Sequence, residues 1–380
     1  ISLLCWNAWG QSPMTSVPVE TRSTLLSIDR SMSPKAGFRL MDPMEISLVF
    51  TNLLAVERHM TNQMLLNGSG VCAGDVDRDG LVDLYFTSLD GPNRLYRNRG
   101  QWRFEDITLA AGLDCPESDS TACAFADLDG DADLDLLVHT MYRGLRVFQN
   151  NGELKFTEKT QTAGMVAAKG GMSLAVADYD MDGDLDIYVT RYRSEAMMDE
   201  VQATVRIKTE GSERSVSHFN NRPTTDPDLR NRFYIDQRGG IGEYGEEDTL
   251  YRNLGGFAFE AVDWTDGTFL DDQAQPLSEP PRDWGLAVQF HDLNHDGLPD
   301  LYVCNDFDTP DRIWINAGNG SFQAMAPQTL RQTSWFSMGM DVADVNRDGK
   351  DDILVLDMLA RDHATRMNQL GDVKPVLELI

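Results

Sequence analysis

The chain has 380 residues, with 61 Asp and Glu against 33 Lys and Arg, and a formal net charge of −28 at pH 7. So acidic a protein is repelled by phosphate groups, which excludes nucleic acid and anionic membrane surfaces as partners. A helix that crosses a membrane needs roughly 18 or more consecutive apolar residues. The sequence has no such run, and no membrane span is expected.

The N-terminal 35 residues are expected to lie outside the folded domain. Residues 1–9 are apolar and are typical of the end of a signal-peptide hydrophobic region. Residues 11–35 are rich in Ser, Thr and Pro, as linkers are. A lipobox ending at Cys5 is a weaker interpretation, because Leu4 stands where a small residue is wanted. Residues 36–380 are assigned to one β-rich domain.

Residues 38–70 precede the regular part of the chain. The apolar segments 38–40, 46–50 and 64–66 are candidate strands, and residues 55–64 favour a helical turn. We expect this region to supply an outer strand to a repeat whose inner strands lie elsewhere.

An aspartate-rich segment then occurs five times. In the clearest copy, residues 178–189 read D-Y-D-M-D-G-D-L-D-I-Y-V, with carboxylates at offsets 0, 2, 4 and 8 and Gly183 at offset 5. A hard cation such as Ca²⁺ takes about six to eight oxygen ligands, and the glycine permits the tight turn. The predicted side-chain ligands are Asp75, Asp77, Asp79 and Asp83; Asp127, Asp129, Asp131 and Asp135; Asp178, Asp180, Asp182 and Asp186; Asp292, Asn294, Asp296 and Asp300; and Asp344, Asn346, Asp348 and Asp352. The backbone carbonyls predicted to complete the five sites, at offset 6, are those of Leu81, Asp133, Asp184, Leu298 and Lys350.

The spacing of these loops indicates a repeated structural unit. Their first residues lie 52, 51, 114 and 52 residues apart, so one interval is a repeat with an insertion of about 62 residues. At offset 11, where an EF-hand has its bidentate glutamate, the five loops have Phe or Val, which cannot bind calcium. Short apolar runs such as D-L-Y-F and D-I-Y-V follow each loop and predict buried strands. The sequence therefore predicts loops between strands and excludes helix–loop–helix calcium sensors.

Each repeat contains enough apolar segments for four strands, which is the content of one propeller blade. In the third repeat the strand T-L-Y-R-N begins only at Thr249, so residues 194–248 are predicted to be an insertion containing a hairpin that turns at Gly211. A second long loop, 263–283, is acidic and contains three prolines. The fifth repeat ends near His363 without a complete closing blade. The fold class expected is an all-β propeller of four-stranded blades, with about five blades recognisable here and up to seven in the full protein.

Three segments resemble the FG-GAP/VCBS repeat family: G-D-V-D-R-D-G-L-V-D-L-Y-F, N-R-L-Y-R-N-R-G-Q-W-R-F-E-D-I-T and T-S-W-F-S-M-G-M-D-V-A-D-V-N-R-D-G. Within that family the likeness is strongest to the secreted group that includes cartilage acidic protein and ASPIC-type proteins, and it covers about residues 38–363. The resemblance implies a β-propeller related to the integrin α-subunit head, with calcium in the loops of its blades. Two departures are Ala132, which replaces the loop glycine of the second copy, and the absence of a visible C-terminal ASPIC segment.

Three functions are consistent with these features. The first is an exported, non-catalytic calcium-binding module that adheres to an extracellular protein or matrix through its loops and its insertion. The second is a propeller that binds or processes carbohydrate, with Trp264, Trp284, Trp335 and Phe336 as candidates to stack on sugars; Trp314 stands at a repeat position expected to be blade core. The third is a component of a surface layer or appendage. The chain has no G-x-S-x-G, H-E-x-x-H or Walker motif.

The cysteines and the calcium loops bear on the compartment. The five cysteines form no zinc-binding pattern. Cys115 and Cys123 flank a polar segment and either form a disulfide or remain two small buried thiols. Because calcium is abundant outside the cell, the five loops favour a secreted, periplasmic or cell-surface location.

Overall fold

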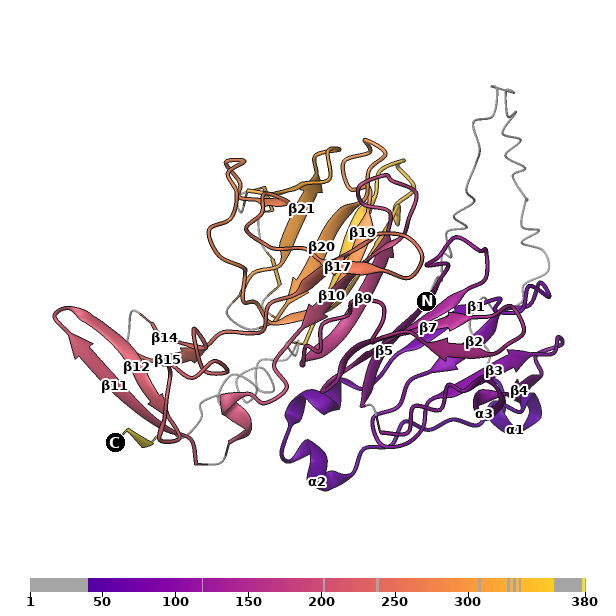
Figure 1. Ribbon diagram of the computed structural model, residues 1–380, viewed down its shortest axis with the longest axis horizontal. Helices are drawn as coiled ribbons and strands as arrows, with labels where there is room; N and C mark the ends of the chain where they lie inside the picture. The colour runs from indigo at the N-terminus through magenta and orange to yellow at the C-terminus, as the bar shows by residue number, and fades with distance from the viewer. Residues whose placement is uncertain are drawn as a thin grey trace.

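The structure is a computed structural model in which the sheets are built mainly from antiparallel neighbours, with few helical turns (Figure 1). Residues 1–35, including Cys5, lie outside the described residues, so the end of a signal peptide, the linker and the lipobox stay predictions. The structure describes residues 40–358 and 378–379, except residues 118, 201, 237–238, 307–308, 327–328, 331–332 and 335.

Four sheets share one pattern, in which four strands pair antiparallel in chain order. This agrees with the expected all-β class and the four strands per repeat. The first sheet contains β1 (Val71–Gly74), β2 (Asp83–Phe86), β3 (Arg94–Asn98) and β4 (Phe104–Asp106), and the second contains β5 (Ser120–Ala126), β6 (Asp135–Thr140), β7 (Gly144–Asn150) and β8 (Phe156–Glu158). The third contains β9 (Gly171–Ala177), β10 (Asp186–Arg191), β16 (Thr249–Asn253) and β17 (Phe259–Ala261), and the fourth contains β19 (Gly285–His291), β20 (Asp300–Asn305), β21 (Arg312–Asn316) and β22 (Phe322–Ala324).

The second strand of each sheet is the apolar run that follows an aspartate loop. All six residues of β6 and all six of β20 are buried, because sheets pack against both of their faces. In these sheets an aromatic residue of the third strand lies opposite an aliphatic residue of the second strand: Tyr96 pairs with Leu84, and Trp314 with Leu301. Trp314 is 1% exposed, so its assignment to the blade core is confirmed.

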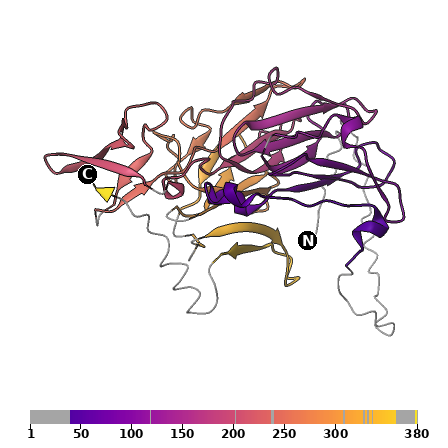
Figure 2. The ribbon, with the colours of Figure 1, turned by 90° about the horizontal axis from the view of Figure 1, so that it is seen from below.

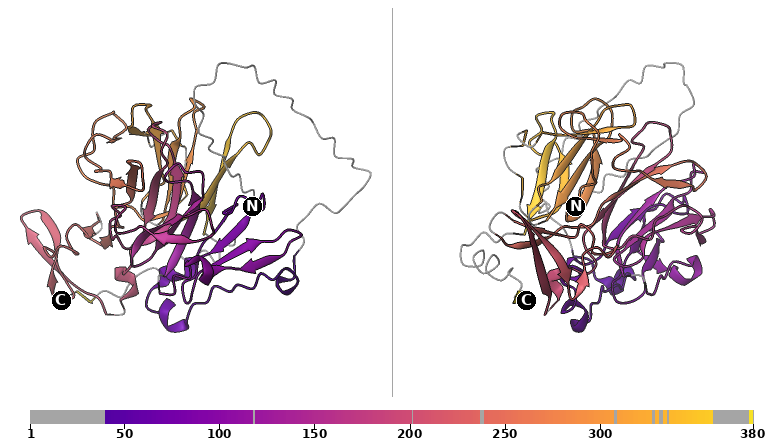
Figure 3. Two further views of the ribbon diagram at one scale, coloured as in Figure 1. Left: turned by 45° about the vertical axis from the view of Figure 1, so that its right-hand side comes forward. Right: turned by 60° about the vertical axis from the view of Figure 1, so that its left-hand side comes forward.

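Successive sheets pack face to face, and the core lies between them. One apolar cluster joins Tyr85 and Leu95 of the first sheet to Leu136 and Phe148 of the second, and equivalent clusters lie between the second and third and between the third and fourth sheets. The first strands also contact one another in order, β1 with β5, β5 with β9, β9 with β19, and β19 with β23 (Figure 3). This neighbour order is the one that a radial array of blades requires.

The third sheet is interrupted in sequence but continuous in space. As predicted, the strand that begins at Thr249 completes it, since β16 pairs directly with β10. The predicted hairpin is also present: β11 (Thr204–Glu210) and β12 (Glu213–Phe219) pair across Gly211, whose φ is +64°. Figures 1 and 2 show this segment projecting to one side of the stacked sheets. The remaining elements there are η2 (Met197–Asp199), β13 (Arg222–Pro223), β14 (Phe233–Ile235), β15 (Ile241–Glu243) and β25 (Glu378–Leu379), which pairs with β11.

The fifth sheet has two strands among the described residues, β23 (Ser337–Ala343) and β24 (Asp352–Asp357). Figure 2 shows this pair as a separate sheet beside the others. In the complete sheets the second strand is covered by a third; in β24 Leu354 and Leu356 are 57% and 60% exposed. The expectation that the fifth repeat is not a complete blade depends on residues 359–377, which lie outside the described residues, and it stays a prediction.

The prediction of strands between residues 38 and 66 is wrong for the part that the structure describes. Residues 40–67 form three helical turns, α1 (Pro43–Ile46), α2 (Val56–His59) and η1 (Gln63–Asn67), of which α2 agrees with the predicted turn. The reason is local: Asp42 accepts a hydrogen bond from the Met44 N–H and Asn62 accepts one from the Met64 N–H, and such caps start helical turns. A fourth turn, α3 (Thr108–Ala111), follows β4.

Candidate metal centres

The five aspartate loops have one backbone conformation. Each lies between the first and second strands of its sheet, as predicted, and each has two residues in the left-handed region, at offsets 3 and 5. In the first loop these are Arg78 (φ +58°) and Gly80 (φ +85°). The second loop has the glycine at the other position, with Gly130 at +76° and Ala132 at +71°. Ala132 therefore keeps the shared conformation at the cost of a left-handed alanine.

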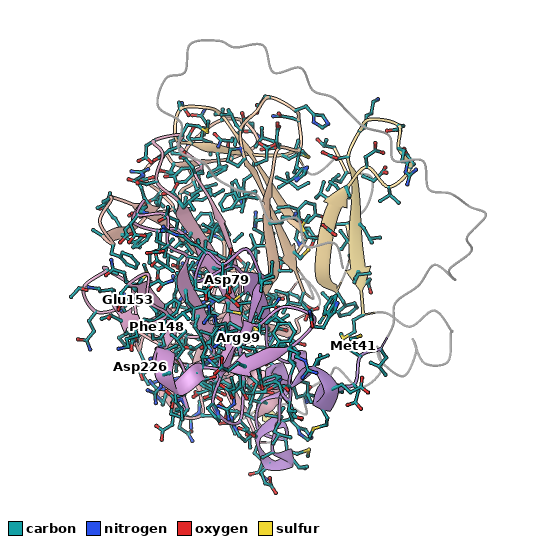
Figure 4. The ribbon with its side chains drawn as sticks, turned by 90° about the vertical axis from the view of Figure 1, so that its right-hand side faces the viewer. Met41, Asp79, Arg99, Phe148, Glu153 and Asp226 are labelled. Atoms are coloured by element: carbon teal, nitrogen blue, oxygen red, sulfur yellow. The ribbon has the colours of Figure 1, made fainter. Side chains whose placement is uncertain are left out.

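The first aspartate of each loop is oriented by backbone N–H groups. In the third loop the N–H groups of Asp182 and Gly183 each donate to a carboxylate oxygen of Asp178 at 3.0 Å. The fourth and fifth loops repeat this arrangement at Asp292 and Asp344. The aspartate at offset 4, labelled for the first loop as Asp79 in Figure 4, accepts the N–H at offset 6. Backbone N–H groups of each loop thus orient the aspartate carboxylates of the same loop. This explains why the spacing of the aspartates matters.

The aspartate at offset 8 is the buried member. Asp83, Asp135, Asp186 and Asp300 are 0% exposed, and each accepts a backbone N–H from offset 1 and another from the third strand; for Asp135 these donors are Leu128 at 2.9 Å and Asn150 at 2.8 Å. Burial, reinforced by neighbouring carboxylates, raises the pKa of Asp83 to about 6 and the pKa values of Asp135 and Asp186 to about 7. A negative charge here calls for a positive partner.

In the first three loops the carboxylates converge on one point. Within each of the sets Asp75, Asp77 and Asp83; Asp127, Asp129 and Asp135; and Asp178, Asp180 and Asp186, one oxygen per residue lies within 4.8 Å of the others. Oδ1 of Asp129 and Oδ1 of Asp180 are buried and accept no hydrogen bond. Buried carboxylate oxygens without donors are costly unless a cation binds them. The donor set, all oxygen, suits Ca²⁺ or Mg²⁺ and not a soft metal.

Polar or positively charged side chains of the third strands contact the aspartate at offset 2 of the first three loops. Arg97 forms an ion pair with Asp77, Gln149 donates to Oδ2 of Asp129 at 2.6 Å, and Arg252 lies 3.4 Å from Asp180. These groups reach one oxygen of each carboxylate from the side. They orient the ligands and reduce the repulsion among them, and one oxygen each of Asp129 and Asp180 remains buried without a hydrogen-bond partner.

The fourth and fifth loops differ from the first three in composition and surroundings. Both have an asparagine at offset 2, which removes one charge, and Nδ2 of Asn294 donates to Asp296 at 2.9 Å. Asp300 is fully buried, but Asp352 of the fifth loop is partly exposed, because no third strand covers it among the described residues. The predicted residues are thus in equivalent places in all five loops, and the arrangement is least enclosed in the fifth.

One set of residues at these centres was not predicted from the sequence, the asparagine that ends each third strand. Nδ2 of Asn253 donates to the carbonyl of Leu185 in its own loop at 3.1 Å and to that of Leu128 in the preceding loop at 2.9 Å. Asn150 and Asn316 make the same pair of contacts. The signal was present as R-N-R-G, Q-N-N-G, R-N-L-G and I-N-A-G. Two consecutive aspartate loops are therefore joined by each of Asn150, Asn253 and Asn316, whereas Asn98 contacts only its own loop.

The aromatic residues considered for sugar stacking are core residues where the structure describes them. Trp264 is 7% exposed, its ring centroid lies 4.1 Å from that of Phe269, and its indole N–H donates to the carbonyl of Asp248 at 3.0 Å. Its prediction as a residue that stacks on sugars is therefore wrong. The loop folds back because β18 (Phe269–Leu270) pairs parallel with β22 and carries these aromatic rings onto the fourth sheet. Trp284 and Phe336 are also buried, and Trp335 lies outside the described residues.

Comparison with known proteins identifies the repeats. The FG-GAP-like repeat matches at residues 75–138, 133–189 and 292–355, which contain all five aspartate loops. Cartilage acidic protein 1 of Xenopus tropicalis is 32% identical over 141 residues, 34% of this chain and 22% of that protein, and the human protein is 27% identical over 140 residues, 33% and 20% respectively. The matched stretch spans about a fifth of the length of these relatives.

Among solved structures, an Agrocybe aegerita lectin that recognises non-reducing terminal N-acetylglucosamine is 16% identical, with 74% of this chain and 73% of that chain covered and a TM-score of 0.30. The V. cholerae biofilm matrix protein Bap1 is 11% identical, with 77% and 74% covered and a TM-score of 0.29. These scores are low, and the fold rests on the chain's own sheets. The aspartate loops and the sequence matches agree: this chain contains FG-GAP-like repeats and is distantly similar to cartilage acidic protein 1 over about a third of its length.

Proposed function

We propose that this protein is an exported β-propeller module whose aspartate loops bind Ca²⁺ and which attaches to an extracellular protein or matrix without catalysing a reaction. The observation that carries the calcium part is the set of buried, unpartnered carboxylate oxygens at Asp129 and Asp180, each beside a fully buried aspartate. A bound cation would offset the repulsion among these carboxylates and their cost of burial.

The proposed ligands are those expected from the spacing: the side chains at offsets 0, 2, 4 and 8 and the carbonyl at offset 6. The order of the first strands from β1 to β23 supports a radial array of blades. Calcium in every loop would change the formal charge of −28 by two for each ion, so the acidity is in part the property of a metal-loaded protein.

Adhesion is proposed for the parts that project from the sheets. The segment between β10 and β16 has its own apolar core, which includes Val205, Val216 and Phe219. It is held to the rest of the protein by buried polar contacts, among them the Tyr192 hydroxyl with Asp306 at 3.1 Å and the Asn62 side chain with the carbonyl of Ser194 at 2.7 Å. A rigidly attached hairpin with exposed strands is a suitable recognition surface. No helix among the described residues is long and apolar enough to cross a membrane.

Calcium binding is tested first by thermal unfolding. Chelation should lower the Tm markedly, and added Ca²⁺ should restore it, whereas NaCl at equal ionic strength should not, because a ligand that binds only the folded state stabilises it. Equal melting curves with and without chelator contradict the proposal. Metal content after dialysis against calcium should approach five ions per chain.

A matched pair of variants separates ligand chemistry from net charge. Asp180→Asn removes a predicted side-chain ligand, and Asp184→Asn makes the same charge change at a residue predicted to bind through its carbonyl alone. Calcium affinity should fall at least tenfold in the first variant and stay near the wild-type value in the second. Equal losses in both would show a general electrostatic effect and no site.

Attachment is tested on a panel of immobilised extracellular-matrix proteins and on a glycan array, in calcium and in chelator. The proposal expects calcium-dependent retention by a matrix protein, which is lost when residues 204–219 are replaced by a short Gly–Ser linker. Unchanged calcium stoichiometry in that variant controls for folding. Retention by glycans alone, or turnover of a glycan, would instead favour the carbohydrate alternative.

A further inference from the structure

The first strands of the first and second sheets approach each other closely. A Cβ added at Gly70 of the first repeat would lie 3.0 Å from Cα of Ala122, and one added at Gly74 would lie 3.3 Å from Cβ of Phe125. Cys72 lies midway between these glycines. Because alternate residues of a strand point to the same side, its side chain faces β5 at the level of Cys123.

Side-chain contacts place the two sulfurs together. The Cys123 thiol lies 3.6 Å from the carbonyl oxygen of Tyr85 and donates to it. Tyr85 is the residue directly opposite Cys72 in the pairing of β1 with β2. The Cys123 thiol is also close enough to the Cys72 thiol to raise its pKa, after the larger effect of burial. Both are free thiols in this structure.

We propose that Cys72 and Cys123 are an oxidation site, at which a disulfide joins the first strands of the first two sheets. A disulfide needs Cβ atoms about 3.5 to 4.5 Å apart. The separation at the neighbouring Gly74–Phe125 pair, 3.3 Å, shows that the two strands are near enough. The bond would link segments 51 residues apart in sequence and belonging to different sheets.

The position of Cys115 distinguishes this pairing from the one considered on sequence alone. The Cys115 sulfur lies 3.9 Å from the Tyr85 hydroxyl, at the outer end of that side chain, whereas the Cys123 sulfur lies at the Tyr85 carbonyl. The length of a tyrosine therefore separates Cys115 from Cys123. A bond between these two would need a rearrangement around a side chain that is 0% exposed.

Access and chemistry are consistent with thiol–disulfide exchange. Cys123 lines a cavity of about 610 Å³ beside β1, together with Gly70 and Val71, whereas Cys72 is buried and burial raises the pKa of its thiol well above the usual range. The Cys123 thiolate attacks a small-molecule disulfide, forming a mixed disulfide and releasing one thiol; the Cys72 sulfur, as it gives up its proton, then attacks Cys123 and releases the second. The two protein thiols are oxidised and one external disulfide is reduced to two thiols.

The test is peptide mapping of the full chain after incubation with oxidised glutathione, with free thiols alkylated before digestion. Trypsin releases Cys72 in residues 59–78 and leaves Cys115 and Cys123 together in residues 104–143. A second cut after Glu117 separates these two. The expected product links 59–78 to the fragment that contains Cys123. It should persist in Cys115→Ser and be lost in Cys72→Ser and Cys123→Ser.

A link from residues 59–78 to the Cys115 fragment, a Cys115–Cys123 link, or no intramolecular link after the unfolded chain has been shown to oxidise would each overturn the proposal. Because Cys72→Ser can disturb the core, the wild-type protein gives a second measurement. Its Tm should rise on oxidation and return on reduction with dithiothreitol. The same shift should occur in Cys115→Ser and be absent in Cys123→Ser.

Discussion

Ala132 is the residue at offset 5 of the second aspartate loop, where the other four loops have glycine. It has φ +71°, a conformation that costs an alanine about 1 kcal/mol. Replacing it by glycine, Ala132→Gly, should therefore raise the free energy of unfolding by about 1 kcal/mol, less the greater freedom of glycine in the unfolded chain. Denaturant unfolding with saturating calcium measures this difference.

Gly80→Ala in the first loop is the matched control, since Gly80 holds the same offset with φ +85° and has no atom within 4 Å of an added Cβ. It should destabilise the protein by a similar amount, from backbone strain alone. If Ala132→Gly instead lowers the free energy of unfolding, the alanine methyl makes a favourable contact and backbone strain is not the dominant effect.

His139 is a buried neutral residue that gives the fold a pH dependence separate from the aspartate loops. It is 1% exposed in β6 between apolar neighbours, Ala122 on β5 and Leu145 on β7. Its Nδ1 is buried without a hydrogen-bond partner, and Arg191 on β10 is the charged group that acts on it. Burial, and then the positive charge of Arg191, lowers its pKa to about 3.

Because the folded pKa lies below the unfolded value of about 6.5, the unfolded state binds more protons, and this contribution to stability is complete above pH 6.5 and is lost as the pH falls toward 3. As the pH falls, the free energy of unfolding of His139→Gln should therefore decrease less steeply than that of the wild type, by up to about 1.4 kcal/mol per pH unit. The measurement is the difference in unfolding free energy between variant and wild type from pH 7 to 4.5. His59→Gln, at a partly exposed histidine, is the control, and parallel curves for all three proteins would contradict the prediction.

The metal ligands could be placed from sequence because their spacing is a local property. Offsets 0, 2, 4 and 8 define the loop through hydrogen bonds that span at most eight residues, as between Asp178 and Gly183. The role of Trp264 could not be predicted, because it depends on a parallel pairing of Phe269 with Phe322, 53 residues away. The Cys72–Cys123 contact likewise depends on the packing of two sheets.

At the scale of the strand, the asparagine that ends each third strand makes a testable difference between otherwise similar repeats. Asn253 donates to carbonyls of two loops, whereas Asn98 donates to one, Val82 at 2.9 Å, since no sheet precedes the first among the described residues. Asn253→Ala leaves two carbonyls without a donor and should cost roughly 3 kcal/mol. Asn98→Ala should cost about 1 kcal/mol, because the Val82 carbonyl that loses its donor is open to water.

Thermal or denaturant unfolding of both variants in calcium measures these costs. Both side chains also accept a hydrogen bond from a glycine two residues later, so the comparison isolates the additional contact between loops. Equal costs would mean that the bond to Leu128 contributes nothing to stability.

The same elements show where reasoning from sequence succeeded for strands and where it failed. Strands after the loops were predictable, because apolar, β-branched and aromatic residues follow a fixed turn in every repeat. Residues 46–50 were equally apolar but form no strand. They pack on the first sheet through their side chains and one backbone group: the Phe50 ring stacks on that of Phe86 at 4.9 Å, and the Tyr96 hydroxyl donates to the Val49 carbonyl at 2.6 Å. Apolar composition alone does not distinguish a strand from a segment that packs against a sheet in this way.

At the scale of the whole molecule, the asparagines turn a row of separate loops into a coupled series. Loops one and two are joined by Asn150, loops two and three by Asn253, and loops three and four by Asn316. Each contact runs from a later sheet back to the loop before it. Disorder in one loop should therefore be felt in the next sheet along the chain, more than in the sheet before it.

Asp180→Asn tests this direction of coupling. By weakening cation binding in the third loop, it should free the carbonyl of Tyr179, which accepts a hydrogen bond from Asn316 at 2.7 Å, and so raise amide hydrogen exchange in β21 of the fourth sheet as well as in β9 and β10. Exchange in β5 and β6 of the second sheet should change less.

Asp344→Asn is the matched control, because the carbonyl of Val345 in the fifth loop receives no such asparagine from the described residues and Val345 is 72% exposed. Its effect on exchange should stay within β23 and β24. If Asp180→Asn also acts only within its own sheet, the blades unfold independently and the bridging asparagines align them without transmitting the state of the metal. If β21 responds, calcium in one loop stabilises the next sheet, and the five loops act together in holding the array.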